Sequence, residues 1–228
     1  PAILFIHGGG WRNGDKRAGN FIRPTLEFAG KGYVCVSVNY RMLDEGPITI
    51  CVEDVKNAVR WLRANAEKYN IDPDRIGAYG NSAGAHLSAM LGVCPASAGL
   101  EGDGPYQEYS SMVQAVVASA TPTDFVGRMS NRQPRPGAQD NPPPNRPSSE
   151  PEEIRKKVSP MTYVTEDAPP IMLIHEISDR TVGVWHSDNF VKALREAGAK
   201  DVSYLLLGDK SGHGAFMRNI DVTGPARE

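Results

Sequence analysis

Six short apolar runs alternate with amphipathic segments along nearly the whole chain, and this rhythm constrains the fold more than any other feature. Most of the apolar runs are continuous, as expected for strands that are covered on both faces. The segments between them repeat apolar residues every three or four positions, which is typical of helices. The predicted strands are 2–6, 33–38, 75–79, 114–119, 171–175 and 202–207, and the predicted helices are 20–30, 50–67, 83–92, 151–157 and 184–197. Alternating units of this kind predict an α/β fold with a doubly wound, mainly parallel sheet.

Length, charge and cysteine content narrow the class of protein. The 228 residues are enough for one well-buried α/β domain, and we expect a single domain over residues 1–228. The formal net charge of -2 offers no basic surface for nucleic acid, and no apolar run approaches the length of a membrane span. The cysteines Cys35, Cys51 and Cys94 are widely spaced without a Cys-x-x-Cys pair. We therefore expect buried free thiols, with no metal site and no cofactor.

The chain opens at Pro1, already inside a predicted strand and without an initiator methionine. We expect that upstream sequence is missing, so a signal peptide is neither visible nor excluded. The cellular compartment is left open.

One stretch breaks the alternation of strands and helices. Residues 126–160 form a predicted insertion, and its part from Asn131 to Pro151 is rich in proline, glycine, asparagine and serine. This composition indicates a loop or extended segment with no packed element. A solvated excursion and a flap beside a functional site both fit it.

The sequence Gly80-Asn81-Ser82-Ala83-Gly84 lies between a predicted strand and a predicted helix. Gly-x-Ser-x-Gly in this position is the signature of a nucleophile elbow, a turn that pushes a serine hydroxyl out beyond the end of a strand. Such a turn strains the serine and brings neighbouring backbone so close that only very small residues fit on either side. A glycine-rich turn without chemistry is the alternative, and the presence of partners for Ser82 decides between them.

The first predicted strand ends in the glycine-rich stretch His7–Trp11. Consecutive glycines let backbone N–H groups point at one spot, and with the N–H of Ala83 they would stabilise the oxyanion of a tetrahedral intermediate. A phosphate-binding turn is the alternative. However, no Gly-Lys-Ser/Thr follows, and Asn13 stands where Gly-x-Gly-x-x-Gly needs glycine. His7 is expected to be structural, locking the loop.

A base and an acid for Ser82 are found near the carboxyl end. His213 is flanked by glycines on the loop after the last predicted strand, whereas His86, His175 and His186 fall inside predicted helices or a strand. His213 is therefore the predicted general base. Asp179 lies in the loop after strand 171–175, which makes it the candidate acid. An N-cap for the helix that begins near residue 184 is its alternative role.

These motifs together resemble the α/β-hydrolase superfamily, over nearly all of residues 1–216. The chain is most similar to the esterase branch, which includes hormone-sensitive-lipase-like carboxylesterases and bacterial feruloyl and acetylxylan esterases. The stretches 122–125 and 159–170 also resemble that branch. The resemblance implies the following site: Ser82 as nucleophile, His213 as base, Asp179 as acid, Gly8, Gly9 and Ala83 as oxyanion donors, and Trp11 and Asn81 as substrate-binding candidates.

The chain departs from the family pattern around the acid. Family members usually have His-Gly where this chain has His175-Glu176, and proline where it has Gly183. Their antiparallel amino-terminal strands are also absent here. Glu176 is thus a rival carboxylate, although its replacement of a glycine suggests a substrate-facing or solvated position. Asp179 is favoured because the family motif places the acid there.

The predicted function is hydrolysis of short-chain or aromatic carboxylic esters through an acyl-enzyme, since the 121–160 segment is too polar for a long acyl tunnel. The expected partner is a small-molecule ester, and an acylated plant-polysaccharide fragment is one candidate. An amidase resembling arylformamidases, or a serine peptidase, is the alternative within the fold. A non-catalytic hydrolase-fold binding protein is a third hypothesis, and the retention of all three triad residues argues against it.

Overall fold

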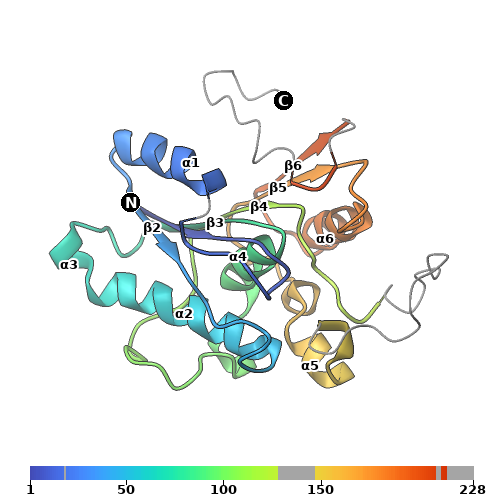
Figure 1. Cartoon of the computed structure of the whole chain (residues 1–228), viewed down its shortest axis with the longest axis horizontal. Coiled ribbons are helices and arrows are strands. Elements are labelled where there is room, and N and C mark those ends of the chain that lie inside the picture. The colour runs from blue at the N-terminus through green and yellow to red at the C-terminus, as the bar shows by residue number, and fades with distance from the viewer. Residues whose placement is uncertain (18, 128–146, 209–211, 215–228) are drawn as a thin grey trace.

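The computed structural model describes residues 1–17, 19–127, 147–208 and 212–214. In these residues six parallel strands form one sheet in the order β2-β1-β3-β4-β5-β6 (Figure 1). The strands are β1 Ala2–Ile6, β2 Val34–Val38, β3 Ile76–Asn81, β4 Ala115–Ser119, β5 Ile171–Glu176 and β6 Val202–Leu207. The prediction of a doubly wound parallel sheet is confirmed, and each strand lies within two residues of its predicted bounds.

The helices also follow the predicted order. They are α1 Gly19–Gly30, α2 Ile48–Ala64, α3 Ala66–Tyr69, α4 Ala83–Val93, α5 Glu152–Lys157 and α6 Trp185–Glu196, with short 3₁₀ turns η1 Ala96–Ala98, η3 Pro147–Ser149 and η4 Pro160–Tyr163. The single helix expected over 50–67 is instead divided at Asn65, whose side-chain amide donates to the Trp61 carbonyl oxygen at 2.9 Å and so competes with the helix backbone. Among the described residues, no helix combines the length and apolarity needed to cross a membrane.

Successive side chains of a strand point to opposite faces of the sheet, so a continuous apolar run makes both faces apolar. Leu4 and Ile6 of β1 face the core beneath α2, α4 and α6, whereas Phe5 faces Phe21 of α1 on the other side. Figure 1 shows α1 separated by the sheet from α2 and α4. Cover on both sides explains why β1 reads as a continuous apolar run.

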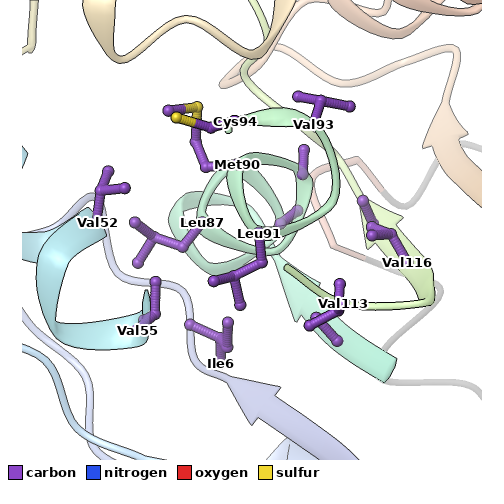
Figure 2. Packing of buried hydrophobic residues seen from close by; sticks show 14 of the residues in the cluster. Ile6, Val52, Val55, Leu87, Met90, Leu91, Val93, Cys94, Val113 and Val116 are labelled. Atoms are coloured by element: carbon purple, nitrogen blue, oxygen red, sulfur yellow. The ribbon is translucent and has the colours of Figure 1, made fainter. Parts of the chain in front are cut away.

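Helix α4 lies at the centre of the core, and every residue from Ala83 to Val93 is buried. Figure 2 shows Leu87 and Leu91 directed toward Val52 and Val55 of α2, with Ile6 of β1 beneath them. A helix that is apolar on all sides must be enclosed by protein. Ser82 directly precedes α4 and is therefore held in place by an enclosed helix.

The order of the strands decides where the site forms. The chain order reverses between β1 and β3, which are neighbours in the sheet, so the loops after these two strands meet at their carboxyl ends, where sheets of this kind bind their ligands. Those loops carry Gly8 and Ser82. On the far side of β4, the strands β5 and β6 are followed by the loops of Asp179 and His213. All four groups therefore lie at the carboxyl-end edge of the sheet.

The predicted insertion at 126–160 is described only in part. Residues 128–146 lie outside the described residues, and with them most of the Asn131–Pro151 stretch. From residue 147 onward the segment is packed: Pro147, Val158 and Pro160 are buried, and the Arg155 guanidinium donates to the Phe125 carbonyl oxygen at 2.9 Å.

Two cations on α2 are wholly buried, which the sequence did not indicate. The Lys56 Nζ lies 2.7 Å from a carboxylate oxygen of Glu101, and the Arg60 guanidinium pairs with the other oxygen. Lys56 also donates to the Cys94 carbonyl oxygen at 2.8 Å. Because buried charges need partners, this cluster fixes the segment after α4 against α2. Cys51 and Cys94 are buried free thiols as expected, whereas Cys35 is only partly buried.

Candidate active site

The backbone of Ser82 is strained in the way that a nucleophile elbow requires. Its φ is 55° and its ψ is -120°, outside the regions that residues with a side chain ordinarily occupy. A Cβ built on Gly84 would lie 1.9 Å from the Ile6 carbonyl oxygen, and one built on Gly80 would lie 2.2 Å from the Gly84 carbonyl oxygen. The expectation that only very small residues fit at both positions is confirmed, and these distances exclude even a Cβ. The Ser82 N–H donates to Ser119 at 2.8 Å, which anchors the turn to β4.

The structure brings three of the predicted site residues into one hydrogen-bonded series. The His213 Nε2 lies 2.9 Å from the Ser82 Oγ, and its Nδ1 lies 2.7 Å from the Asp179 Oδ2. A carboxylate can only accept, so Nδ1 carries the proton and Nε2 is left to accept from the serine hydroxyl. The His213 side chain is 23% exposed, whereas the Asp179 side chain is fully enclosed.

The carboxylate of Asp179 is surrounded by donors. Its Oδ1 accepts from the backbone N–H groups of Thr181 at 2.8 Å and Val182 at 2.9 Å. Burial alone would raise the pKa of Asp179, but hydrogen bonds from His175, His213 and the Val182 N–H outweigh it and hold the pKa well below its ordinary range. The alternative role as helix N-cap is wrong: the N-cap of α6 is Val184, and Asp179 caps its own loop.

Glu176 lies at the end of β5 and is wholly buried. Of the substrate-facing and solvated positions expected for this residue, the solvated one is therefore wrong. Its backbone pairs with Leu207 in the ladder between β5 and β6, which places the residue inside the sheet. The carboxylate that the His213 Nδ1 contacts belongs to Asp179.

The glycines after β1 bring backbone against Ser82. A Cβ built on Gly8 would lie 2.8 Å from the Asn81 carbonyl oxygen and 3.3 Å from the Ser82 Cβ. Gly9 has a φ of 120°, which favours glycine. Within the described ranges, the N–H groups of Gly8, Gly9 and Ala83 donate to no other protein group. Their predicted role as oxyanion donors stays a prediction that this arrangement allows.

His7 has the structural role expected from the sequence. Its ring is buried and stacks on Tyr40 with the ring centroids 4.5 Å apart, and its Nδ1 donates to the Gly8 carbonyl oxygen at 2.8 Å. The Tyr40 hydroxyl donates to the His7 carbonyl oxygen at 2.9 Å. Burial lowers the pKa of His7, so the ring stays neutral and fixes the course of the glycine loop.

Trp11 lies in the core and is only 8% exposed. Its indole N–H donates to the His86 Nδ1 at 3.2 Å, and the His86 Nε2 donates to the Val158 carbonyl oxygen at 2.7 Å. Sequence reasoning excluded His86 as a base but missed this role. The buried histidine joins the glycine loop, the nucleophile helix and the segment that follows α5. The one signal for it is its place four residues after Ser82, one turn along α4.

Asn81 fills the space between two loops of the site. Its Oδ1 lies 3.1 Å from a Cβ built on Gly8, and its Nδ2 lies 3.2 Å from one built on Gly214. The Nδ2 is buried and has no hydrogen-bond partner among the described residues. Any side chain at position 8 or 214 would therefore displace Asn81.

The buried histidines predict a loss of stability in mild acid. Burial lowers the pKa values of His86 and His186 to about 4, and burial lowers that of His7 as well. The unfolded chain binds these protons near pH 6.5. Between pH 6.5 and 4 the unfolded state thus holds more protons, and the free energy of unfolding falls by up to about 3 kcal/mol for each of the two groups.

Urea unfolding at pH 7 and pH 4.5 measures this loss. The His186 Nδ1 accepts from the Thr123 N–H at 3.2 Å, and His186→Asn keeps such an acceptor without a proton to bind. This variant is expected to lose less stability between the two pH values than the unaltered protein. An unchanged free energy of unfolding from pH 7 to pH 4.5 would contradict the assignment of neutral buried rings.

The sheet is parallel, and a strained serine, a histidine and an aspartate meet at the carboxyl ends of its strands. This arrangement places the chain among the α/β hydrolases, in their esterase branch. The family model BD-FAE matches residues 1–194. The chain belongs to the BD-FAE family.

Comparisons with known proteins agree with this placement. The chain is 30% identical over 226 residues to esterase LipC of Mycobacterium tuberculosis, which covers 99% of this chain and 55% of LipC. Among solved structures, a truncated carbohydrate esterase from gut microbiota is 31% identical with a TM-score of 0.81, over 96% of this chain and 80% of that one. Esterase 2 of Thermogutta terrifontis phosphonylated by sarin is 28% identical with a TM-score of 0.76, over 94% and 75%. The chain spans about half the length of the curated relatives it matches.

Proposed function

We propose that the protein hydrolyses carboxylic esters through a covalent acyl-enzyme on Ser82. The observation that supports this most strongly is the continuous series from the Ser82 Oγ through His213 to Asp179, with contacts of 2.9 and 2.7 Å. Ser82 attacks the ester carbonyl as His213 takes its proton, and His213 returns the proton to the leaving alcohol. Water, activated by the same imidazole, then releases the acid.

The backbone donors around Ser82 stabilise the tetrahedral intermediates in this proposal. Gly8, Gly9 and Ala83 offer N–H groups beside the nucleophile, and the loss of one such donor typically costs about 10²- to 10³-fold in turnover. Trp11 and His86 hold the glycine loop from behind. We place Trp11 as a support for this loop, because its indole N–H already has a partner, and Asn81 as a substrate-binding candidate.

The likeness to LipC and to a phosphonylated esterase 2 supports serine-based ester hydrolysis over a purely binding role. The likeness to a carbohydrate esterase supports an acylated saccharide as one substrate candidate. Steady-state hydrolysis of p-nitrophenyl butyrate and of the matched butyryl anilide tests the class of reaction. We expect the ester to be turned over and His213→Ala to abolish that turnover. Equal or faster cleavage of the anilide would favour the amidase alternative.

Acyl-chain length provides a test of substrate class. The described groups around Ser82 are mainly polar or glycine and form no long apolar channel, and the composition of the insertion is proline-rich and polar. We predict higher kcat/KM for acetyl, butyryl or feruloyl esters than for a palmitoyl ester, by about tenfold or more, since each unburied methylene forfeits its binding energy. All esters are compared in one detergent below its critical micelle concentration. Preferential turnover of the palmitoyl ester would contradict this proposal.

A further inference from the structure

A second histidine lies behind the proposed acid. His175 is the fifth residue of β5 and is wholly buried. Its Nε2 lies 3.4 Å from the Asp179 Oδ2, the same oxygen that the His213 Nδ1 contacts at 2.7 Å. Two imidazoles, one from β5 and one from the loop after β6, thus converge on one carboxylate oxygen.

The other contacts of His175 fix its tautomer. Its Nε2 also lies 3.0 Å from the Val182 carbonyl oxygen, which can only accept, so Nε2 carries the proton. Its Nδ1 lies 2.7 Å from the Oγ of Ser187, a fully buried residue in the first turn of α6, and accepts the hydroxyl proton. The N–H at Nε2 is therefore shared between Val182 and Asp179.

We propose that His175 is a positioning residue that holds the carboxylate of Asp179 in the orientation that His213 needs. This inference rests on the proposed function and deepens it. The loop backbone alone fixes Oδ1 through Thr181 and Val182. His175 fixes Oδ2 relative to β5 and, through Ser187, to α6, so the acid is tied to the sheet as well as to its own loop.

The consequence for catalysis follows from the charge on His213. The proposed transition state carries an imidazolium, which a correctly placed carboxylate stabilises. Without the Nε2 donor, the Asp179 Oδ2 is held, among the described residues, by His213 alone while Oδ1 stays on the loop backbone, so Oδ2 is less firmly placed and the imidazolium loses part of its support. The 3.4 Å separation is long for a hydrogen bond, so the expected effect is smaller than that of removing the acid.

The test compares His175→Leu, which removes the donor, with His175→Gln, whose amide nitrogen reaches about as far as Nε2. We expect His175→Leu to lower kcat by about tenfold with KM changed less than about twofold, the pattern of an interaction used mainly in the transition state. The acid limb of the kcat/KM profile, which reports His213, is expected to move to lower pH. His175→Gln is expected to restore most of kcat and to return the acid limb close to its original pH.

Other titratable groups lie near His175. His186 of α6 interacts electrostatically with His175, Asp179 and Asp124, and its pKa of about 4 keeps it neutral in the working range. Glu176 follows His175 on β5 and is unchanged in every variant. A purely structural His175 would alter the free energy of unfolding and leave the acid limb in place.

Ser187→Ala provides a second test that does not depend on the folding of His175→Leu. It leaves the His175 ring without its Nδ1 partner and is expected to move kcat and the acid limb in the same direction by a smaller amount. Unchanged kcat and acid limb in the folded variants would overturn the inference. If instead Ser82→Ala kept full activity, the proposed function would fail first, so the two failures are distinguishable.

Discussion

Replacement of Ser82 by alanine is expected to lower ester turnover by about 10⁴-fold or more, because removal of a triad nucleophile leaves only binding and the oxyanion donors to act. The substitution removes one hydroxyl, which contacts the His213 Nε2 at 2.9 Å. The turn is held by its backbone, through the Ser82 N–H to Ser119 and through the close approach of Gly80 and Gly84. We therefore expect the fold to be retained.

Ser88→Ala is the matched control. Ser88 lies on α4, the buried helix that Ser82 precedes. Its hydroxyl donates to the Gly84 carbonyl oxygen at 2.9 Å, away from the His213 imidazole. It is expected to change turnover by less than about tenfold. Circular dichroism and thermal unfolding establish that both variants are folded. If folded Ser82→Ala kept even a tenth of the activity, Ser82 would not be the nucleophile.

Asp179→Asn is expected to lower turnover by about 10²- to 10⁴-fold near neutral pH with the fold intact. The two backbone N–H groups at Oδ1 require an oxygen there, so the new amide nitrogen must take the place of Oδ2. It would then present N–H groups to the His213 Nδ1–H. To avoid facing donors, the ring must place its proton on Nε2, where it can no longer accept from Ser82.

Glu176→Gln is the companion variant on the neighbouring carboxylate. Glutamine is nearly isosteric with glutamate, and Glu176 ends β5, the strand that precedes the Asp179 loop. The proposed mechanism uses no charge there, so turnover is expected to change by less than about tenfold. Kinetics of both variants, measured side by side at pH 7.5, assign the acid. A severe loss in Glu176→Gln with a mild one in Asp179→Asn would show that the acid is misassigned.

Much of the fold and the position of the site could be predicted, because local chemistry and topology agree. Continuous apolar runs predicted strands covered on both faces, and parallel order then brought their carboxyl ends together. Gly80 and Gly84 could be interpreted in advance, since only a close approach of backbone explains glycine on both sides of a serine. The spacing of Ser82, Asp179 and His213 in sequence placed each on a loop at the same edge.

Tertiary packing decided what the sequence could not show. Lys56 and Arg60 lie on the helix face that meets Glu101, 41 or more residues away, and nothing local predicts their burial. Trp11 donates to His86, a pairing that depends on the contact between the glycine loop and α4, whereas its candidacy for substrate binding stays a prediction. Glu176 was expected to face the substrate or the solvent, and its complete burial excludes the solvent-facing position.

The central claim is that Ser82 is a nucleophile activated by His213. Stoichiometric labelling with a fluorophosphonate, followed by peptide mass spectrometry and parallel ester assays, tests it most directly. We predict one label per chain, attached to Ser82, with activity lost in proportion to labelling and with labelling strongly slowed in His213→Ala. A label on another residue, or ester hydrolysis that survives complete labelling of Ser82, would contradict the account.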